Sequence, residues 1–334
     1  MVNRRPTLEQ VAARAKVSRG TVSRVVNGDG KVSARTRAAV LQAIDEVGYV
    51  PNRAARMLAA RRTGTVALVM SEERGRPFEQ PYFGHIVRGI SSAVTAAETT
   101  LTLTFTQSPA GRADLADALR AQRVDGVVMV SLIREDPLPS LLERYGVPVV
   151  LGGRPHDSGA ARPDYVDADN RGGARRAVEY LIGQGRRRIA TIAGPQDTSV
   201  GVDRLAGYRE ALSGGRELVA HGDFSESGGA GAMLRLLDLE PSLDAVFAAS
   251  DNMALGALRV LERHGRRVPD DVAVVGFEDA GAERRAQPRL TTVHQPTETM
   301  GRRSAELLLS RIRGIPVADA PVICDTRLVV RESA

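Results

Sequence analysis

The chain has 334 residues, of which 43% are hydrophobic and 26% are charged, enough to bury a large core spread over two or three domains. The sequence contains no apolar run near the roughly 18 residues that cross a bilayer, and no signal-peptide pattern follows its first residues. A single cysteine, Cys324, excludes an intramolecular disulfide and suits a reducing compartment. We therefore expect a cytoplasmic protein without membrane contact.

Positive charge is concentrated at the N-terminus. Residues 1–62 carry 13 Lys and Arg against 4 Asp and Glu, although the whole chain has a net charge of only +6. The remaining residues are therefore net negative. A basic segment on a neutral-to-acidic body is typical of a DNA-binding head. A solubilising tail fits poorly, because periodic apolar residues lie between the basic ones.

Residues 7–27 predict two short amphipathic helices, with Thr7 and Ser18 as their N-caps. Apolar residues recur at helical spacing on one face of each, namely Leu8, Val11 and Ala12 on the first and Val22, Val25 and Val26 on the second. Such a pair forms a helix-turn-helix, whose second helix lies in a DNA major groove. Its outward arginines, Arg19 and Arg24, can pair bidentately with guanine. A helical hairpin with a solvated basic face is the alternative.

Two further helical segments follow in the basic region. Ser33 caps a predicted helix over residues 34–47, which ends at Gly48 and whose inward side chains are Val40, Leu41, Ile44 and Val47. Residues 53–60 are too few for a stable isolated helix, yet they place Met57 and Leu58 beside arginines. This composition suits a helix that forms on DNA and wedges an apolar side chain into the minor groove. A short helix docked on the body is the alternative.

From residue 65 the pattern alternates between strands and helices. The predicted strands are 65–70, 100–105, 126–130, 147–151, 188–192, 245–248 and 272–277, and the predicted helices between them are 85–97, 115–121, 173–183, 204–212 and 252–264. This alternation implies parallel sheets covered on both faces. We expect two lobes, with ligands at the carboxyl ends of the strands.

Enzyme functions fit the sequence poorly, although such sheets host many of them. The glycine run at residues 228–231 lacks the strand-then-helix setting of a dinucleotide site, and neither a P-loop nor a nucleophile elbow occurs. The five histidines are scattered without metal-ligand spacing. We expect no catalytic residues, no cofactor and no metal. A solute-binding protein would share the body but not the basic head.

Motifs along the whole chain resemble the lactose-repressor/galactose-repressor family of bacterial transcription regulators. The head carries TVSRVVN at 21–27, VSARTR at 32–37 and GYVPN at 48–52. The body carries DGVV at 125–128, GVPVV at 146–150, DN at 169–170, Arg204 with GY at 207–208, DNMALG at 251–256, PRLTTV at 288–293 and LVVRES at 328–333.

The resemblance implies an all-α helix-turn-helix head at 1–50, a hinge helix and linker at 51–63, and a two-lobed α/β body with parallel sheets at 64–334, similar to periplasmic sugar-binding proteins. The N-lobe would comprise about 64–166 and 294–324, and the C-lobe about 167–293 and 325–334.

By position, the resemblance also implies the DNA-binding residues. They are Thr7, Ser18, Arg19, Gly20, Thr21, Ser23, Arg24, Asn27, Asn52, Ala55, Arg56 and Leu58. Leu58 would be the minor-groove wedge, and Arg4, Arg5, Arg53 and Arg56 would touch phosphates. Gly20 departs from the family, because a side chain usually reads a base there. Specificity at that base is therefore weak or passes to Arg19.

The implied effector site lies between the lobes and comprises Phe83, Arg204, Phe224, Ser250, Asp251, Glu278 and Gln295. The guanidinium of Arg204 suits sugar hydroxyls or a carboxylate, Phe224 would stack on the ligand ring, and Phe83 would line the opposite wall. Glu278 replaces a usual aspartate, so that either Glu278 or Asp279 contacts the ligand.

The implied function is that of a homodimeric repressor on a pseudo-palindromic double-stranded operator. A small molecule, in this family most often a sugar and in some members a purine-type corepressor, would close the cleft and change the affinity for DNA.

Overall fold

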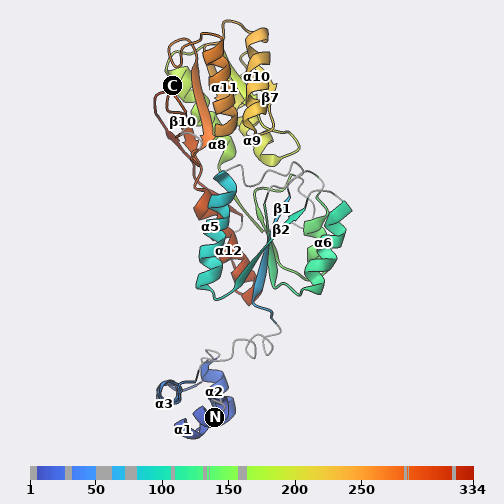
Figure 1. Ribbon diagram of the computed structural model, residues 1–334, viewed down its shortest axis with the longest axis vertical. Coiled ribbons are helices and arrows are strands. Elements are labelled where there is room, and N and C mark those ends of the chain that lie inside the picture. The colour runs from blue at the N-terminus through green and yellow to red at the C-terminus, as the bar shows by residue number, and fades with distance from the viewer. Residues whose placement is uncertain are drawn as a thin grey trace. The chain divides into compact units, whose positions relative to one another are not determined.

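The structure is a computed structural model, and it describes residues 6–26, 32–49, 62–71, 81–106, 110–130, 134, 136–156, 164–281, 284, 286–317 and 321–334. Contacts divide the chain into two units, Met1–Thr63 and Gly64–Ala334, which Figure 1 draws and which are described separately below. We call the first unit the head and the second the body.

The head contains helices α1 (Leu8–Ala15), α2 (Arg19–Val26) and α3 (Ala34–Val47). A capping box starts α1, because the Thr7 hydroxyl accepts from the Gln10 amide while the Thr7 amide donates to the Gln10 side chain at 2.9 Å. The Ser18 hydroxyl accepts from the Thr21 amide at 3.1 Å at the start of α2. The predicted helices and N-caps are therefore confirmed. Their core consists of Val11, Ala12, Val22, Val25, Val40, Ala43 and Tyr49.

The prediction assigned one side chain of α3, that of Leu41, to the wrong face of the helix. Leu41 is 54% exposed, whereas Ala43 is buried. The packed stripe runs through Val40, Ala43, Ile44 and Val47, at spacings of three and four residues, and this stripe already covers the core. Leu41 follows Val40 by one residue and is therefore rotated about 100° away from it.

The body's first lobe is built on a parallel sheet of strand order β11-β5-β4-β3-β1-β2 (Figure 1). Its strands are β1 (Thr65–Ser71), β2 (Thr100–Thr106), β3 (Gly126–Val130), β4 (Val149–Gly152), β5 (Asp164–Ala168) and β11 (Val322–Cys324). Helices α5 (Pro81–Ala96) and α12 (Thr297–Arg313) cover one face, and α6 (Ala110–Ala121) and α7 (Leu138–Arg144) cover the other. Alternate β1 side chains enter the two cores, Leu68 and Met70 one of them and Ala67 and Val69 the other.

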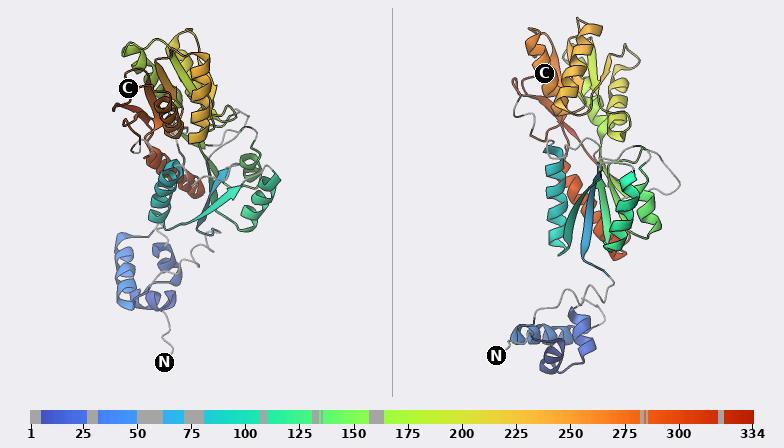
Figure 2. Two further views of the ribbon diagram at one scale, coloured as in Figure 1. Left: turned by 45° about the horizontal axis from the view of Figure 1, so that its top comes forward. Right: turned by 45° about the vertical axis from the view of Figure 1, so that its right-hand side comes forward.

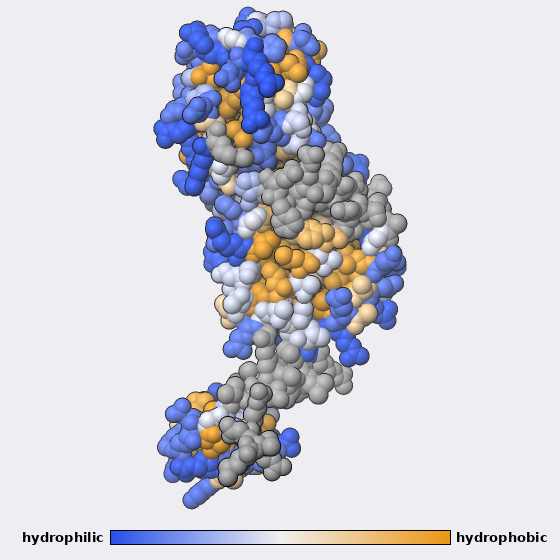
Figure 3. Space-filling view, in the orientation of Figure 1, coloured by the Kyte–Doolittle hydropathy of each residue, from blue (hydrophilic) through white to orange (hydrophobic). Residues whose placement is uncertain are grey.

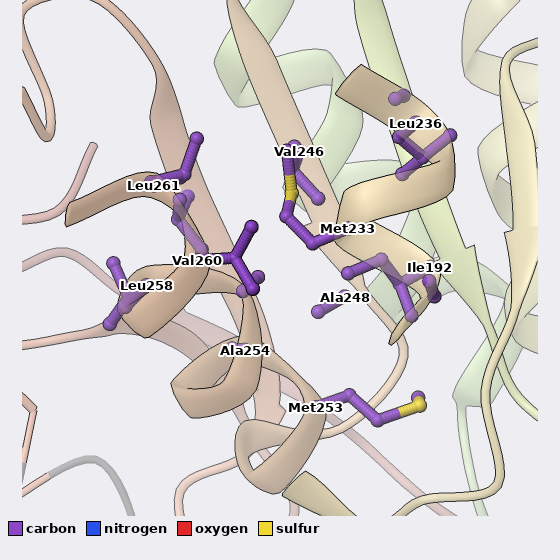
Figure 4. Close-up of a cluster of buried hydrophobic side chains, with 14 of the residues drawn as sticks. Ile192, Met233, Leu236, Val246, Ala248, Met253, Ala254, Leu258, Val260 and Leu261 are labelled. Atoms are coloured by element: carbon purple, nitrogen blue, oxygen red, sulfur yellow. The ribbon is translucent and has the colours of Figure 1, made fainter. Parts of the chain in front are cut away.

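The second lobe repeats this plan with strand order β12-β10-β9-β8-β6-β7. Its strands are β6 (Ile189–Ala193), β7 (Val219–His221), β8 (Ala245–Ala248), β9 (Ala273–Glu278), β10 (Thr291–His294) and β12 (Arg327–Val329). All described pairs are parallel except β10 with β12. Helices α8 (Asn170–Gly183) and α9 (Ser199–Leu212) cover one face. Helices α10 (Glu226–Leu239) and α11 (Asp251–Arg263) cover the other, over the core drawn in Figure 4.

The seven predicted strands are confirmed to within two residues, but several elements were missed. Strand β5 escaped because it begins with polar residues, and β7, β11 and β12 are only three residues long. Helix α10 contains the glycine run at 228–231, which lowers helix propensity. Tertiary packing overrides that propensity, since α10 buries Met233 and Leu236 against α11.

Helices α5 and α12 lie side by side in both views of Figure 2, and glycines set how closely they approach. A Cβ on Gly89 would overlap the carbonyl oxygen of Glu298, and a Cβ on Gly301 would overlap that of Ile86. The two backbones therefore touch where each helix lacks a side chain.

The chain passes between the lobes after β5, after β10 and after β11. Each lobe is consequently assembled from segments that are distant in sequence. These crossing segments carry several of the residues considered next.

Candidate DNA-reading surface and effector site

The outward face of α2 carries the predicted base-reading residues. Arg19, Gly20 and Arg24 are exposed, while Val22 and Val25 on the opposite face are buried. Thr21 and Ser23 are half-buried beside them. The head therefore presents two arginines to solvent from the helix that a helix-turn-helix inserts into the major groove.

Arg19 also contacts α1. Its Nε lies 3.2 Å from Oε1 of Glu9, with both side chains exposed. A hydrogen bond from the Glu9 backbone amide, another from the Thr7 side chain, and the Arg19 charge lower the pKa of Glu9. Thr7, predicted to touch DNA, is also the N-cap of α1.

Part of the predicted DNA-binding set falls outside the described residues. This part comprises Asn27, Asn52, Ala55, Arg56 and Leu58, together with the phosphate candidates Arg4, Arg5 and Arg53. The minor-groove wedge therefore remains a prediction.

In the body, Arg204 is the centre of a buried hydrogen-bond network. Its Nε donates to Asn170 Oδ1 at 2.9 Å, and its two terminal nitrogens donate to the Ala249 carbonyl at 2.6 Å and to Gln295 Oε1 at 2.8 Å. Its guanidinium carbon lies 3.7 Å from the ring centroid of Phe277. Asn170 begins α8 directly after the passage that follows β5, and Gln295 lies in the passage between β10 and α12, so that Arg204 joins the second lobe to two crossing segments.

Glu278 is the carboxylate nearest to Arg204, with Oε1 3.7 Å from a terminal nitrogen. Burial raises the pKa of Glu278 to about 7, and the charge of Arg204 opposes this rise. Burial likewise lowers the pKa of Arg204, which Glu278 counteracts. Glu278 has φ of 119°, a backbone conformation that is strained for a residue with a side chain.

Asp279, the alternative to Glu278, is engaged elsewhere. Its carboxylate accepts from Arg331 at 2.6 Å and lies 3.1 Å from Nδ1 of His294. Of the two acidic residues, the geometry therefore places Glu278 beside Arg204.

Ser250 and Asp251 are buried within the framework of the second lobe. The Ser250 hydroxyl accepts from the Met253 amide as the N-cap of α11. The Asp251 carboxylate accepts from the Thr292 hydroxyl at 2.5 Å and from the Asp279 amide at 2.8 Å. The two bonds to Asp251 tie the start of α11 to β10 and to the residue that follows β9, and effector contact by Ser250 or Asp251 stays a prediction.

The two predicted aromatic residues have different surroundings. Phe224 is half-buried at the edge of the second lobe's core, and a Cβ on Gly194 would lie 2.5 Å from its ring. Phe83 is buried in the core of the first lobe. Its neighbour Tyr82, which sequence reasoning passed over, stacks edge-on against it at 5.3 Å. Burial and the charges of Asp167 and Glu278 raise the pKa of Tyr82, and the charge of Arg204 opposes this rise. We call Arg204, Asp167, Glu278 and Tyr82 the Arg204 cluster.

A second set of contacts joins the lobes and was not predicted. Arg154, which follows β4, donates to both carboxylate oxygens of Asp203 on α9, at 2.8 and 3.1 Å. The Ser199 hydroxyl donates to the Arg154 carbonyl at 2.6 Å. We call these three residues the inter-lobe clasp. Since Asp203 immediately precedes Arg204, the clasp and the Arg204 network share one turn of α9.

Asp167 connects the two sets. Its carboxylate accepts from the Arg154 amide at 2.9 Å and from the Asn170 side chain at 3.0 Å, and Asn170 in turn accepts from Arg204. Burial raises the pKa of Asp167. Asp167 and Asn170 lie at the carboxyl end of β5, where an α/β sheet is expected to bind ligands. The sequence would have indicated them had β5 been predicted.

Within the described ranges, no group of three or more His, Cys, Asp and Glu side chains is arranged to hold a metal ion. The same residues include no helix of the length and apolarity that a membrane span requires.

A helix-turn-helix head with exposed arginines and a two-lobed body with parallel sheets define a ligand-responsive DNA-binding regulator. Comparison with known proteins agrees. Residues 7–52 match the model of bacterial regulatory proteins of the lacI family, and residues 178–334 match that of the periplasmic binding protein-like domain.

Relatives extend over the whole chain. It is 53% identical to the HTH-type transcriptional regulator CelR of Thermobifida fusca over 99% of this chain and 98% of that protein. Identity to the HTH-type transcriptional repressor PurR of Proteus mirabilis (strain HI4320) is 35%, over 98% and 96%.

Solved structures give the same result. The transcriptional regulator CelR–cellobiose complex matches with a TM-score of 0.78 and 51% identity, over 99% of this chain and all of that one. The lac repressor dimer bound to operator and the anti-inducer ONPF matches with a TM-score of 0.73, at 28% identity and over 99% of each chain. The chain belongs to the lacI family. Like these relatives, it is a DNA-binding transcriptional regulator and not an enzyme.

Proposed function

We propose that this regulator is a cytoplasmic homodimeric repressor that leaves its pseudo-palindromic operator when a neutral sugar of the cellobiose type binds between its lobes. The observation that carries the proposal is that this chain is 51% identical, over 99% of its length, to a regulator solved as a cellobiose complex. The head (1–50), the hinge and linker (51–63) and the body (64–334) would then act as the DNA reader, the coupling segment and the effector receptor.

The chemistry of the Arg204 cluster supports a neutral polyhydroxyl ligand. Arg204 supplies donors, while Glu278 and Asp167 supply acceptors close by. Hydroxyl groups both donate and accept, so that they can satisfy a site of mixed character. The carboxylates offset the charge of Arg204, which disfavours a sugar phosphate. Phe224 would supply the aromatic surface on which a sugar ring stacks.

Calorimetric titration of the full-length protein tests the effector class. We expect cellobiose to bind, and glucose, a sugar phosphate and guanine to bind at least tenfold more weakly. Binding of guanine in preference to cellobiose would support the purine-type alternative instead. Fluorescence anisotropy on a selected operator duplex then decides the direction, because an inducing sugar must weaken the complex and a corepressor must strengthen it.

The edge of the first lobe supports dimerisation. Strand β2 forms one edge of the described sheet and exposes Leu103 and Phe105, each about 40% accessible. Figure 3 shows hydrophobic residues gathered over the area where Figure 1 labels β1 and β2. Apolar side chains on an exposed edge strand favour burial against another chain. A second copy, placed symmetrically, would cover both edges.

Light scattering tests this interface. We expect the double substitution Leu103→Lys and Phe105→Glu to convert dimers into monomers. The matched control is Leu239→Lys, which changes an exposed leucine on α10 of the other lobe and should leave the dimer intact. An unchanged mass for the β2 variant would place the interface elsewhere.

A further inference from the structure

The contact between Glu9 and Arg19 is unusual for its location. The head segment is strongly basic, yet an acidic side chain on α1 lies 3.2 Å from the first arginine of the reading helix. An exposed carboxylate on a DNA-binding surface opposes the phosphate attraction that gives non-specific affinity. Glu9 therefore weakens one component of binding, and a compensating role is expected.

The first turn of α2 offers few side chains that reach a base. Gly20 has none, although a Cβ there would meet only the Ser18 hydroxyl, at 3.8 Å, so that packing does not require a glycine. Thr21 is short and its hydroxyl lies 2.9 Å from that of Ser18. Base reading in this turn consequently depends on Arg19.

An arginine that reads guanine must hold its long side chain in one conformation, and doing so opposes considerable rotamer entropy. A guanidinium held at Nε can still present its two terminal nitrogens to guanine O6 and N7. Glu9 makes its contact at Nε. Glu9 lies in the first turn of α1, whose start is held by the capping box of Thr7 and Gln10.

We propose that Glu9 is a positioning residue for DNA recognition, which holds the Arg19 guanidinium for guanine and so raises base discrimination while lowering non-specific affinity. The proposal rests on base reading by Arg19. The alternative is a purely structural Glu9, which would stabilise the N-terminus of α1 through its charge.

The test uses full-length protein and a duplex selected by the wild type from a randomised pool, together with its single-base-pair substitutions. Dissociation constants at one fixed salt concentration are compared for the wild type, Glu9→Gln, Arg19→Ala and the double variant. The matched control is Glu46→Gln, which removes the same charge from an ion pair of α3 with Arg14, at 2.5 Å.

We expect Glu9→Gln to reduce the preference for guanine at one base pair about two- to fivefold, the range of an exposed ion pair, while affinity for random DNA rises. Glu46→Gln should raise affinity for random DNA without changing any base preference. In the Arg19→Ala background, Glu9→Gln should leave all preferences unchanged, because Glu9 acts through Arg19.

Two results would overturn the proposal differently. If Arg19→Ala removes a base preference but Glu9→Gln does not reduce it, or reduces it equally without Arg19, the positioning role is wrong and base reading stands. If Arg19→Ala changes no base preference, base reading by Arg19 is itself wrong, and the role of Glu9 falls with it.

Discussion

Replacing Glu278 by Gln should change how stability depends on pH. The ordinary pKa of this carboxyl is 4.5, and burial raises it to about 7 in the folded protein. Between these values the folded state binds a proton that the unfolded state releases. The stabilising contribution is therefore complete below pH 4.5 and is lost as the pH rises through 7.

The size follows from the two pKa values. Each tenfold difference in proton affinity is worth about 1.4 kcal/mol, so that raising the pKa from 4.5 to about 7 corresponds to about 3 kcal/mol. Glutamine does not titrate. The free energy of unfolding of the wild type, minus that of Glu278→Gln, should accordingly fall by about 3 kcal/mol between pH 4.5 and pH 8.

Urea titrations followed by far-UV circular dichroism measure this difference, which suits a chain without tryptophan. Asp271→Asn is the control, because hydrogen bonds from Arg267 lower the pKa of Asp271 to about 2 and place its transition below this pH range. A difference for Glu278→Gln that stays constant would refute the reasoning. A difference that grows with pH would mean that the charge of Arg204 outweighs burial.

Four further substitutions test helix packing, helix propensity and the clasp. Gly89→Ala should lower the free energy of unfolding by about 1–3 kcal/mol, because the added Cβ overlaps α12. Gly84→Ala in the same helix, where a Cβ meets nothing, should raise it by about 0.5–1 kcal/mol. Equal effects of the two substitutions in thermal unfolding would contradict the close contact between α5 and α12. Gly20→Ala should likewise raise head stability by about 0.5–1 kcal/mol, seen as slower amide exchange in α1–α3. Asp203→Asn weakens the half-buried ion pair with Arg154. It should reduce the affinity for sugar up to about fivefold, the effect of a pair worth about 1 kcal/mol, and leave the affinity for operator DNA unchanged. If calorimetry shows no loss of sugar affinity, the clasp has no part in effector binding.

The amino-acid sequence by itself determined the features that depend on neighbouring residues. Thr7 and Ser18 cap helices because their side chains bond to amides three residues ahead. Most of the predicted strands have near-continuous apolar runs because both faces of a parallel sheet are covered, whereas residues 100–105 alternate threonine with apolar residues. Such signals act over a few residues, and any fold containing the segment must respect them. Family motifs added Arg204, Glu278 and Gln295.

Only the tertiary structure decided what surrounds Arg204. Its three hydrogen-bond partners are separated from it by 34, 45 and 91 positions in the sequence, and no local pattern encodes such pairings. The same holds for the clasp between Arg154 and Asp203. It also holds for Tyr82, which lies near Arg204, whereas Phe83 had been predicted at the effector site, and for Leu41, which faces solvent. In each case the decisive fact is which segments the passages between the lobes, or the packing of helices, bring together in space.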